Sequence, residues 1–483
     1  GVGVFLYRIF MCVLLTKNAY HSIMKASLED TWMNKKMKKD VKLSPSAIIA
    51  VGFLLLILTA TLLLMLPISA QNRQSTPLLT SLFTATSAVC VTGQALVDTG
   101  THWSLFGQVV LIVAIQIGGL GVMTLMALVS MALGKRIGLR QRTLLQESVA
   151  SFQVGGIVRL VRFAMRGTAV VEGCGAVLLS FRFVPMLGWA KGIWYGVFHS
   201  ISAFCNAGFD LMGPISGEFT SLESFVGDPF VNGVVIMLIL LGGLGFFVWE
   251  DLFKNRLHWK KLRLHTRVAL TLAAVLVVVP SLFFFFTEKN ASMAGLPLGT
   301  RIWASAFSAV TPRTAGFDTV PTGELSPAGG LMTLILMMTG GNSGSTAGGA
   351  KTTTILLVLL TAASILKGEE NVHIFGRRIE NDLLRRACSI VVVYFTMGML
   401  ATLAICAVQP EFTLQQVLIE VFSAIDTVGL TTGITRDLNT FSRIVIIMLM
   451  YAGRLGSMTF IILLTRRKPP APVQYPTDKV VIG

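Results

Sequence analysis

The sequence predicts an all-α integral membrane protein in which four tandem repeats surround a central pore. Composition is the first observation: of 483 residues, 53% are apolar and 13% are charged, and mean hydropathy is +0.72. A soluble globular chain carries about 25% charged residues, roughly twice as many. The second observation is a set of four similar glycine-bearing loops that lie between long apolar runs. We therefore expect helices that cross a membrane and loops that enter it.

Long apolar runs mark the membrane-crossing helices. Most are long enough to span a hydrocarbon core of roughly 30 Å as a helix. They are Ala47–Leu66, Val109–Leu133, Val231–Phe247, Val268–Phe286, Leu331–Thr339, Ile390–Val408 and Ile444–Leu464.

Basic residues are concentrated in alternate connections between these runs. Of the 40 Lys and Arg residues, 29 lie in segments 16–42, 134–166, 250–267, 367–386 and 466–479, whereas 210–228 contains none. This positive-inside pattern predicts a multi-pass protein with both termini in the cytoplasm. We interpret the net charge of +16 as a surface facing anionic membrane lipid, and we expect no nucleic-acid partner.

The four glycine loops recur at a regular distance. They are Ser87–Gly93, Ser202–Gly208, Ser308–Gly316 and Ser423–Gly429, and their last glycines are separated by 115, 108 and 113 residues. Each follows a short amphipathic stretch with a phenylalanine, and these stretches are too short to span a membrane. The phenylalanines are Phe83, Phe198, Phe307 and Phe422. The third loop is two residues longer than the others, with Pro312 and Arg313 in the insertion.

A second glycine motif follows each loop inside an apolar run. The motifs are Gly118–Gly121, Gly242–Gly245, Gly340–Gly344 and Gly453–Gly456. The repeating unit is therefore span, half-helix, loop and span, which predicts eight spans and four re-entrant half-helices. We expect repeats over residues 43–133, 134–250, 251–366 and 367–465, with cytoplasmic segments 1–42 and 466–483 at the ends.

The loops predict an ion pathway. Irregular backbone at membrane depth is tolerated only inside protein or along a watery cavity, and rings of backbone carbonyls can replace the hydration shell of a monovalent cation. Thr427-Val428-Gly429 matches the start of the TVGYG loop of potassium channels, whereas the other three loops are degenerate. The expected filter residues, which would bind potassium through backbone carbonyls, are Val91, Thr92, Gly93, Asn206, Ala207, Gly208, Thr314, Ala315, Gly316, Thr427, Val428 and Gly429.

The third post-filter motif predicts a gate. Residues 340–350 are mostly glycine and small polar residues, and each glycine disfavours a helix by about 1 kcal/mol relative to alanine. We expect this run to be the single break among the post-filter helices, either as a mobile gate or as a packing kink. The expected gate residues are Gly340, Gly341, Asn342, Ser343, Gly344, Ser345, Thr346, Ala347, Gly348, Gly349 and Arg454.

Charged residues near the loops carry further hypotheses. Arg454 stands where the first two repeats have Gly119 and Gly243, and a membrane arginine usually faces a cavity or a partner. It is an electrostatic barrier, a donor that holds 342–346 closed, or both; the alternative is a structural residue at a helix end. Asp426 and Arg313 are expected to pair behind the filter, the alternative being that Asp426 faces the ions.

These loops and motifs, taken together, resemble the Ktr/Trk/HKT superfamily of potassium transporters, and most of all its KtrB branch of bacterial membrane subunits. The resemblance extends from about Leu43 to Gly483. It implies a potassium pathway through Gly93, Gly208, Gly316 and Gly429, with sodium-stimulated uptake and no covalent cofactor. It also implies a homodimer in the bacterial plasma membrane, on a cytosolic KtrA-like ring where regulatory nucleotides bind.

Other function classes fit the sequence less well. No catalytic constellation is visible, and we expect no enzyme activity. An alternating-access Na⁺/K⁺ symporter is the alternative, although its broken helices should occur as symmetric pairs. A membrane potential of 100 mV supplies roughly 2.3 kcal/mol per unit charge, so a gated pore supports uptake without hydrolysing ATP.

Overall fold

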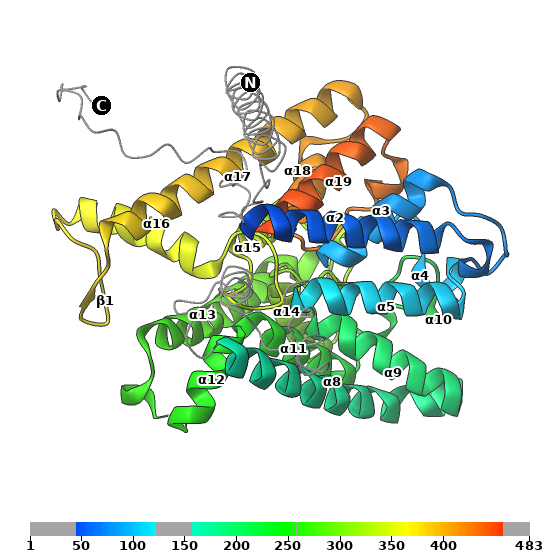
Figure 1. Ribbon diagram of the computed structural model, residues 1–483, viewed down its shortest axis with the longest axis horizontal. Helices are drawn as coiled ribbons and strands as arrows, with labels where there is room; N and C mark the ends of the chain where they lie inside the picture. The colour runs from blue at the N-terminus through cyan, green and yellow to red at the C-terminus, as the bar shows by residue number, and fades with distance from the viewer. Residues whose placement is uncertain (1–44, 122–156, 257, 457–483) are drawn as a thin grey trace, which may run out of the picture. The chain divides into compact units, whose positions relative to one another are not determined.

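A computed structural model describes residues 45–121, 157–256 and 258–456 (Figure 1). About 72% of the described residues are helical. Within the described residues the only sheet is a hairpin of β1 (His373–Ile374) and β2 (Arg377–Arg378). The expected cytoplasmic ends, 1–42 and 466–483, lie outside the described residues.

The described helices repeat in fours, in the predicted order. The first helices of the repeats are α2 (Pro45–Leu64), α8 (Ile157–Leu187), α13 (Leu264–Thr287) and α17 (Asn381–Val408). The half-helices before the loops are α3 (Leu78–Cys90), α9 (Trp189–Phe204), α14 (Leu298–Val310) and α18 (Leu414–Ile425). The post-filter helices are α5 (Leu105–Leu120), α11 (Pro229–Leu244), α15 (Pro327–Thr339) and α19 (Thr440–Leu455).

The remaining elements are connections and helix continuations. They are α4 (Thr99–His102), α10 (Gly213–Ser216), α12 (Phe246–Asn255), α16 (Thr352–Leu366) and the 3₁₀ turns η1 (Pro67–Ser69), η2 (Glu223–Phe225), η3 (Trp259–Lys261), η4 (Glu288–Asn290), η5 (Thr322–Glu324) and η6 (Ile434–Asp437).

The first helix of every repeat is a membrane span by length and composition. Within the described residues these spans are Ser46–Leu64, Val158–Leu187, Leu264–Asn290 and Asn381–Val408, and the bent pair of α11 and α12 qualifies as a fifth. Large apolar side chains such as Leu62 and Phe181 are exposed on these helices, as a lipid-facing surface requires. Because α5 and α19 end at the edges of the described residues, the count of eight spans stays a prediction.

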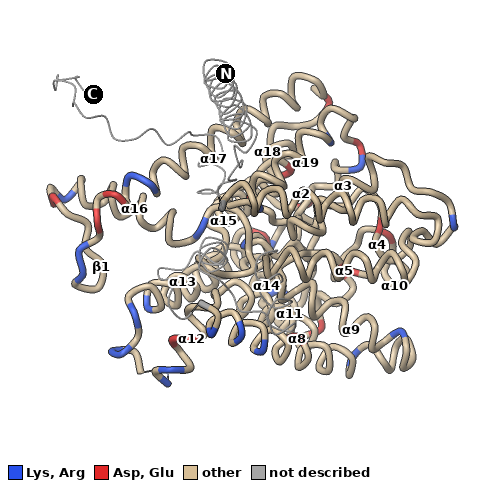
Figure 2. The backbone as a smooth tube through the Cα atoms, viewed as in Figure 1, with Lys and Arg blue, Asp and Glu red and all other residues tan. Residues whose placement is uncertain are grey.

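Basic residues are concentrated in the connections at certain helix ends. Figure 2 shows Lys and Arg gathered around α12, the start of α13 and the β1–β2 hairpin. These segments belong to the basic connections 250–267 and 367–386.

The expectation of a single break among the post-filter helices is wrong. Three further helices stop at the last glycine of their motif: α5 at Gly121 (φ 86°, ψ 135°), α11 at Gly245 (φ 92°, ψ 143°) and α19 at Gly456 (φ 81°, ψ 145°). After Gly245 the chain continues as α12, bent by 93°. Side chains disfavour such angles, so the glycine itself ends the helix. The two or three glycines of each motif weaken the helix, but helix propensity does not show at which of them the helix ends.

The first glycine of the motif lets each post-filter helix touch its own half-helix. In repeats 1, 2 and 4 a side chain there would overlap a backbone carbonyl that lies four residues before the filter glycine. The pairs are Gly118 with Val89, Gly242 with Phe204, and Gly453 with Ile425. The third repeat differs, because Gly340 (φ 45°) instead faces the carbonyl of Ala350 in its own loop.

Glycine also sets the packing of α9 along α8. A Cβ atom at Gly192 would lie 2.5 Å from Cα and 2.6 Å from the nitrogen of Val184. Backbone atoms of a helix cannot move away cheaply, so this contact requires the absence of a side chain.

Gly192→Ala is therefore expected to lower the thermal unfolding midpoint of the purified protein. The physical reason is overpacking against backbone, which costs about 1–3 kcal/mol. The matched control is Gly173→Ala on α8, where nothing lies within 4 Å of the new Cβ, and its midpoint should stay the same or rise slightly. Equal midpoints for the two variants would show that the α8–α9 contact does not depend on Gly192.

Candidate functional site

The four filter glycines close a ring in chain order. A Cβ atom at Gly93 would lie 2.6 Å from the carbonyl oxygen of Ala207 and 3.2 Å from Cα of Gly429. One at Gly208 would lie 2.8 Å from the carbonyl oxygen of Ala315 and 2.9 Å from Cα of Gly316. The remaining two contacts, Gly316 with the carbonyl of Val428 and Gly429 with the carbonyl of Thr92, complete the ring. Four segments more than 100 residues apart in sequence thus meet backbone to backbone.

The four loops share one backbone conformation. In each loop the filter glycine and the residue two positions before it have positive φ. The pairs are Val91 (57°) and Gly93 (101°), Asn206 (57°) and Gly208 (68°), Thr314 (74°) and Gly316 (78°), Thr427 (52°) and Gly429 (98°). Positive φ is rare for β-branched residues such as Val91, and strained backbone of this kind persists where its surroundings hold it. The repeated strain identifies the ring as the candidate site.

Hydroxyl side chains at the ends of the half-helices hold the loops. The amides of Gly93 and Gly429 donate to the Oγ atoms of Ser87 and Ser423, both at 3.0 Å. Ser202 Oγ donates to the carbonyl of Phe209 at 2.7 Å. In the third repeat Thr311, not Ser308, takes this position and donates to the carbonyl of Phe317 at 2.6 Å. The insertion is absorbed before Thr314, so the third loop keeps the shared conformation.

A buried carboxylate that was not predicted from the sequence joins the fourth repeat to the first. Glu420 on α18 accepts a hydrogen bond from Gln94 Nε2 at 2.7 Å and one from Thr435 Oγ1 at 2.9 Å. Thr431 Oγ1 donates to the same carboxylate. Glu420 is 1% exposed. A glutamate within an otherwise apolar half-helix was the available signal, and its partner Gln94 directly follows a filter glycine.

The segment between α15 and α16 is non-helical, as predicted; we name residues 340–351 the intramembrane loop. Its backbone is tied to the second repeat, where Asn342 N donates to Gly243 O at 3.0 Å and Thr346 N to Gly242 O at 3.3 Å. Thr346 Oγ1 donates to the carbonyl of Phe204, at the end of the half-helix α9, at 3.1 Å. The loop thus lies directly beneath the filter loops.

Arg454 connects the intramembrane loop to two other repeats. From α19, its Nη1 donates to the carbonyl of Thr346 at 2.6 Å, and its Nη2 donates to the carbonyl of Gly119 at 2.9 Å and to that of Gly118. One guanidinium therefore joins repeats 1, 3 and 4. Its planar fork of donors suits it to bind several carbonyls at once.

The hypothesis that Asp426 pairs with Arg313 is wrong. Asp426 Oδ1 accepts the amide of Ala350 at 3.2 Å, so this carboxylate is engaged by the intramembrane loop. The Nε and Nη1 atoms of Arg313 have no hydrogen-bond partner. Residue spacing alone could not show that the intramembrane loop takes the place beside Asp426.

Carboxylates follow the first three filter glycines, in connections outside the spanning helices. Burial raises the pKa of Asp210 to about 6, and the neighbouring charge of Asp98 adds to this effect. Burial also raises the pKa of Asp318 well above its ordinary value, with contributions from Glu223 and Asp210. Carboxylates that raise one another's pKa by repulsion are relieved when a cation binds among them. Within the described residues no group of three or more His, Cys, Asp or Glu could hold a resident metal ion.

Comparisons with known proteins agree with this architecture. The family model TrkH, described as a cation transport protein, matches residues 11–472. The chain is 39% identical over 455 residues to the Ktr system potassium uptake protein B of Bacillus subtilis (strain 168), covering 94% of this chain and 100% of that protein. It is also 39% identical over 463 residues to the potassium/sodium uptake protein NtpJ of Enterococcus hirae, with the same coverage of both chains.

A solved structure shares the fold. The crystal structure of the potassium transporter TrkH from Vibrio parahaemolyticus matches with a TM-score of 0.67 and 18% identity, covering 89% of this chain and 86% of that one. The repeats, the closed glycine ring and these matches lead to one conclusion: this chain belongs to the TrkH family of cation transport proteins, which are membrane transporters and not enzymes.

Proposed function

We propose that this chain is the pore-forming membrane subunit of a potassium-uptake system. The observation that carries the proposal is the ring of Gly93, Gly208, Gly316 and Gly429, in which every loop has the same two positive φ angles. Left-handed residues allow successive carbonyls to face one axis, where they replace the water around a dehydrated cation. The names of the two bacterial relatives, both uptake proteins for potassium, support the same ion.

In this proposal the twelve residues 91–93, 206–208, 314–316 and 427–429 form the selectivity filter. Only the fourth loop reads Thr-Val-Gly. The filter should therefore bind fewer cations in well-formed sites than a fourfold identical one, and its preference for potassium over sodium should be looser.

The intramembrane loop acts in this proposal as the gate, and Arg454 as its latch. The loop fills the space beneath the filter while Arg454 holds Thr346. Release of that contact lets the glycine-rich backbone move, because few of its residues have side chains that anchor it.

The proposal includes an assembly. The membrane subunit forms a homodimer in a bacterial plasma membrane and works with a cytosolic nucleotide-binding ring, and sodium stimulates uptake. Support comes from the relative named as one protein of a Ktr system and from the relative named for potassium and sodium. The basic connections around α12 and the β1–β2 hairpin offer a surface for an acidic partner (Figure 2).

Alternating-access Na⁺/K⁺ symport is the second candidate, and one observation favours it. Breaks after α11 and α15 give the second and third repeats each an interrupted helix, a feature of such transporters. The two mechanisms differ in stoichiometry. The two mechanisms can be distinguished by measuring the flux of potassium, sodium and rubidium in proteoliposomes, with and without a sodium gradient. A fixed ratio of Na⁺ flux to K⁺ flux indicates symport, and potassium flux without sodium flux indicates a pore.

Replacement of a filter glycine should remove potassium preference. Gly93→Ala places a Cβ 2.6 Å from the carbonyl of Ala207 at φ +101°, so the ring must distort. We expect the potassium-to-sodium flux ratio in proteoliposomes to fall about tenfold, which corresponds to about 1.4 kcal/mol. Gly188→Ala is the matched control, since Gly188 also has positive φ (+80°) but nothing lies within 4 Å of its Cβ. Equal flux ratios in both variants would refute the pore. The pore would also be refuted if the expressed wild type, with its partner ring, failed to rescue a potassium-uptake-deficient strain.

Arg454→Ala should raise potassium flux. The substitution removes hydrogen bonds from a charged donor, each worth about 1.5–3 kcal/mol, so the flux should increase roughly tenfold or more. Arg454→Lys separates the two functional roles of this residue. A lysine keeps the positive charge but lacks the planar fork that binds carbonyls of repeats 1 and 3 at once. A latch therefore predicts increased flux, and an electrostatic barrier predicts low flux. Unchanged or reduced flux in Arg454→Ala, with a normal unfolding midpoint, would exclude the latch.

A further inference from the structure

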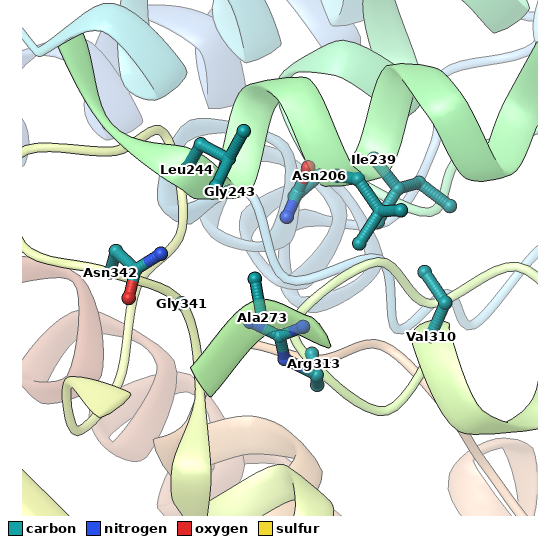
Figure 3. Close-up of a pocket in the computed structure, with 10 residues that line it drawn as sticks. Asn206, Ile239, Gly243, Leu244, Ala273, Val310, Arg313, Gly341 and Asn342 are labelled. Carbon is teal, nitrogen blue, oxygen red and sulfur yellow. The ribbon is translucent and has the colours of Figure 1, made fainter. Parts of the chain in front are cut away.

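A small cavity lies between the second and third filter loops and the intramembrane loop (Figure 3). Its polar lining comes from Asn206, Arg313 and Asn342, and apolar side chains of α11, α13 and α14 complete it. The cavity volume is about 10 Å³, close to the smallest that admits one water-sized particle. Only a single atom or one small molecule fits.

Each of the three polar side chains that line this cavity has at least one buried polar atom without a partner. Arg313 is 6% exposed, and its Nε and Nη1 atoms make no hydrogen bond. Asn342 is fully buried, and neither Nδ2 nor Oδ1 is bonded. Asn206 is 1% exposed and donates from Nδ2 to Thr314 Oγ1 at 3.2 Å, while its Oδ1 has no partner. Buried polar groups are ordinarily paired, so three such side chains around one cavity indicate a missing ligand.

The charges around the cavity determine which kind of ligand it can bind. The cavity lining contains no Asp or Glu, and the ion pairs among the described residues, Arg182–Asp228 and Arg263–Asp251, do not involve Arg313. A buried cation without a counter-charge costs several kcal/mol. In Figure 3 the amide nitrogens of Asn206 and Asn342 are turned toward the space that they share with Arg313, and their oxygens are turned away from it. Because Asn206 Nδ2 is already bonded to Thr314, the free donors at this site come from Arg313 and Asn342, and the site also carries a positive charge.

We propose that this cavity binds one small monatomic anion of the size of chloride. The guanidinium of Arg313 supplies the charge and free donors, and the Nδ2 atom of Asn342 supplies a further free donor. The anion offsets the positive charge that Arg313 would otherwise place three residues before Gly316, where it would repel a cation in the filter.

The site also connects the filter to the intramembrane loop. Arg313 and Asn206 belong to filter loops, whereas Asn342 belongs to the intramembrane loop, whose backbone is held by Gly243. A ligand that needs both Arg313 and Asn342 binds more tightly when the loop is in the position seen here. By linkage, a bound anion then favours that position.

Bromide provides a direct test that does not depend on transport. Wild-type crystals grown in potassium bromide should show one anomalous peak per chain among Arg313, Asn206 and Asn342. The peak should be absent from Arg313→Gln, which removes the charge but keeps an amide donor. A water at this position without anomalous signal, in wild-type crystals at high bromide, would overturn the proposal.

Flux and stability give a second test, at constant potassium concentration. Replacing gluconate, which is too large for the cavity, with chloride should raise the wild-type unfolding midpoint by roughly 2 °C at saturation. It should also lower potassium flux by about fivefold, for a coupling of about 1 kcal/mol. Both effects should disappear in Arg313→Gln and, if that variant does not fold, in Asn342→Ala. The matched control is Arg301→Gln on α14, since Arg301 stacks on Phe285 outside the cavity lining. Identical chloride responses in the wild type and the cavity variants would refute the site.

Discussion

No side chain fits where the four filter loops meet. Each filter glycine faces the backbone of the next loop, so the ring consists of main chain and its geometry is set by φ and ψ rather than by side-chain packing. Because the last contact joins Gly429 to Thr92, the ring requires four complete repeats. Much of the surrounding structure holds the four loops where these backbone contacts can form. The hydroxyls of Ser87 and Ser423 hold the loops, and glycines in the post-filter helices let those helices lie against the half-helices.

The departures from fourfold symmetry are as informative as the repeat itself. The third repeat has a longer loop, an arginine before its filter glycine and a non-helical segment where the other repeats have a helix end. All three differences lie on the same side of the ring, next to the second repeat. At the interface of the fourth and first repeats a buried carboxylate, Glu420, occupies the space behind the loops. A single chain with four repeats can place opposite charges in different quarters, which an assembly of four identical subunits cannot do.

The sequence was sufficient for the repeat, the half-helices and the four loop glycines that meet in the ring, because glycine spacing and apolar length are local properties. It was insufficient wherever the outcome depended on contacts between repeats. The ends of α5, α11 and α19 were missed, because their short glycine motifs lie within long apolar runs and helix propensity does not show which glycine takes a non-helical conformation. The pairing of Asp426 with Arg313 was inferred from equivalent positions, but the intramembrane loop, folded back from another repeat, supplies Ala350 as the partner. Glu420 was overlooked because its partners lie in the first repeat and in a turn after the fourth filter loop.

The order in which the ring closes has a consequence for biosynthesis. The ring cannot close at Gly93 until Gly429 has been synthesised. At a translation rate of about 5–20 residues per second, roughly 20–70 s pass between the synthesis of the two glycines. During that interval the carbonyls of the first loop have no ring to join and cannot be left exposed to lipid. The first three repeats must therefore be held in a protected or partly inserted state until the fourth repeat is made, and a chain cut short within α18 leaves a membrane protein in which the ring of loops is open.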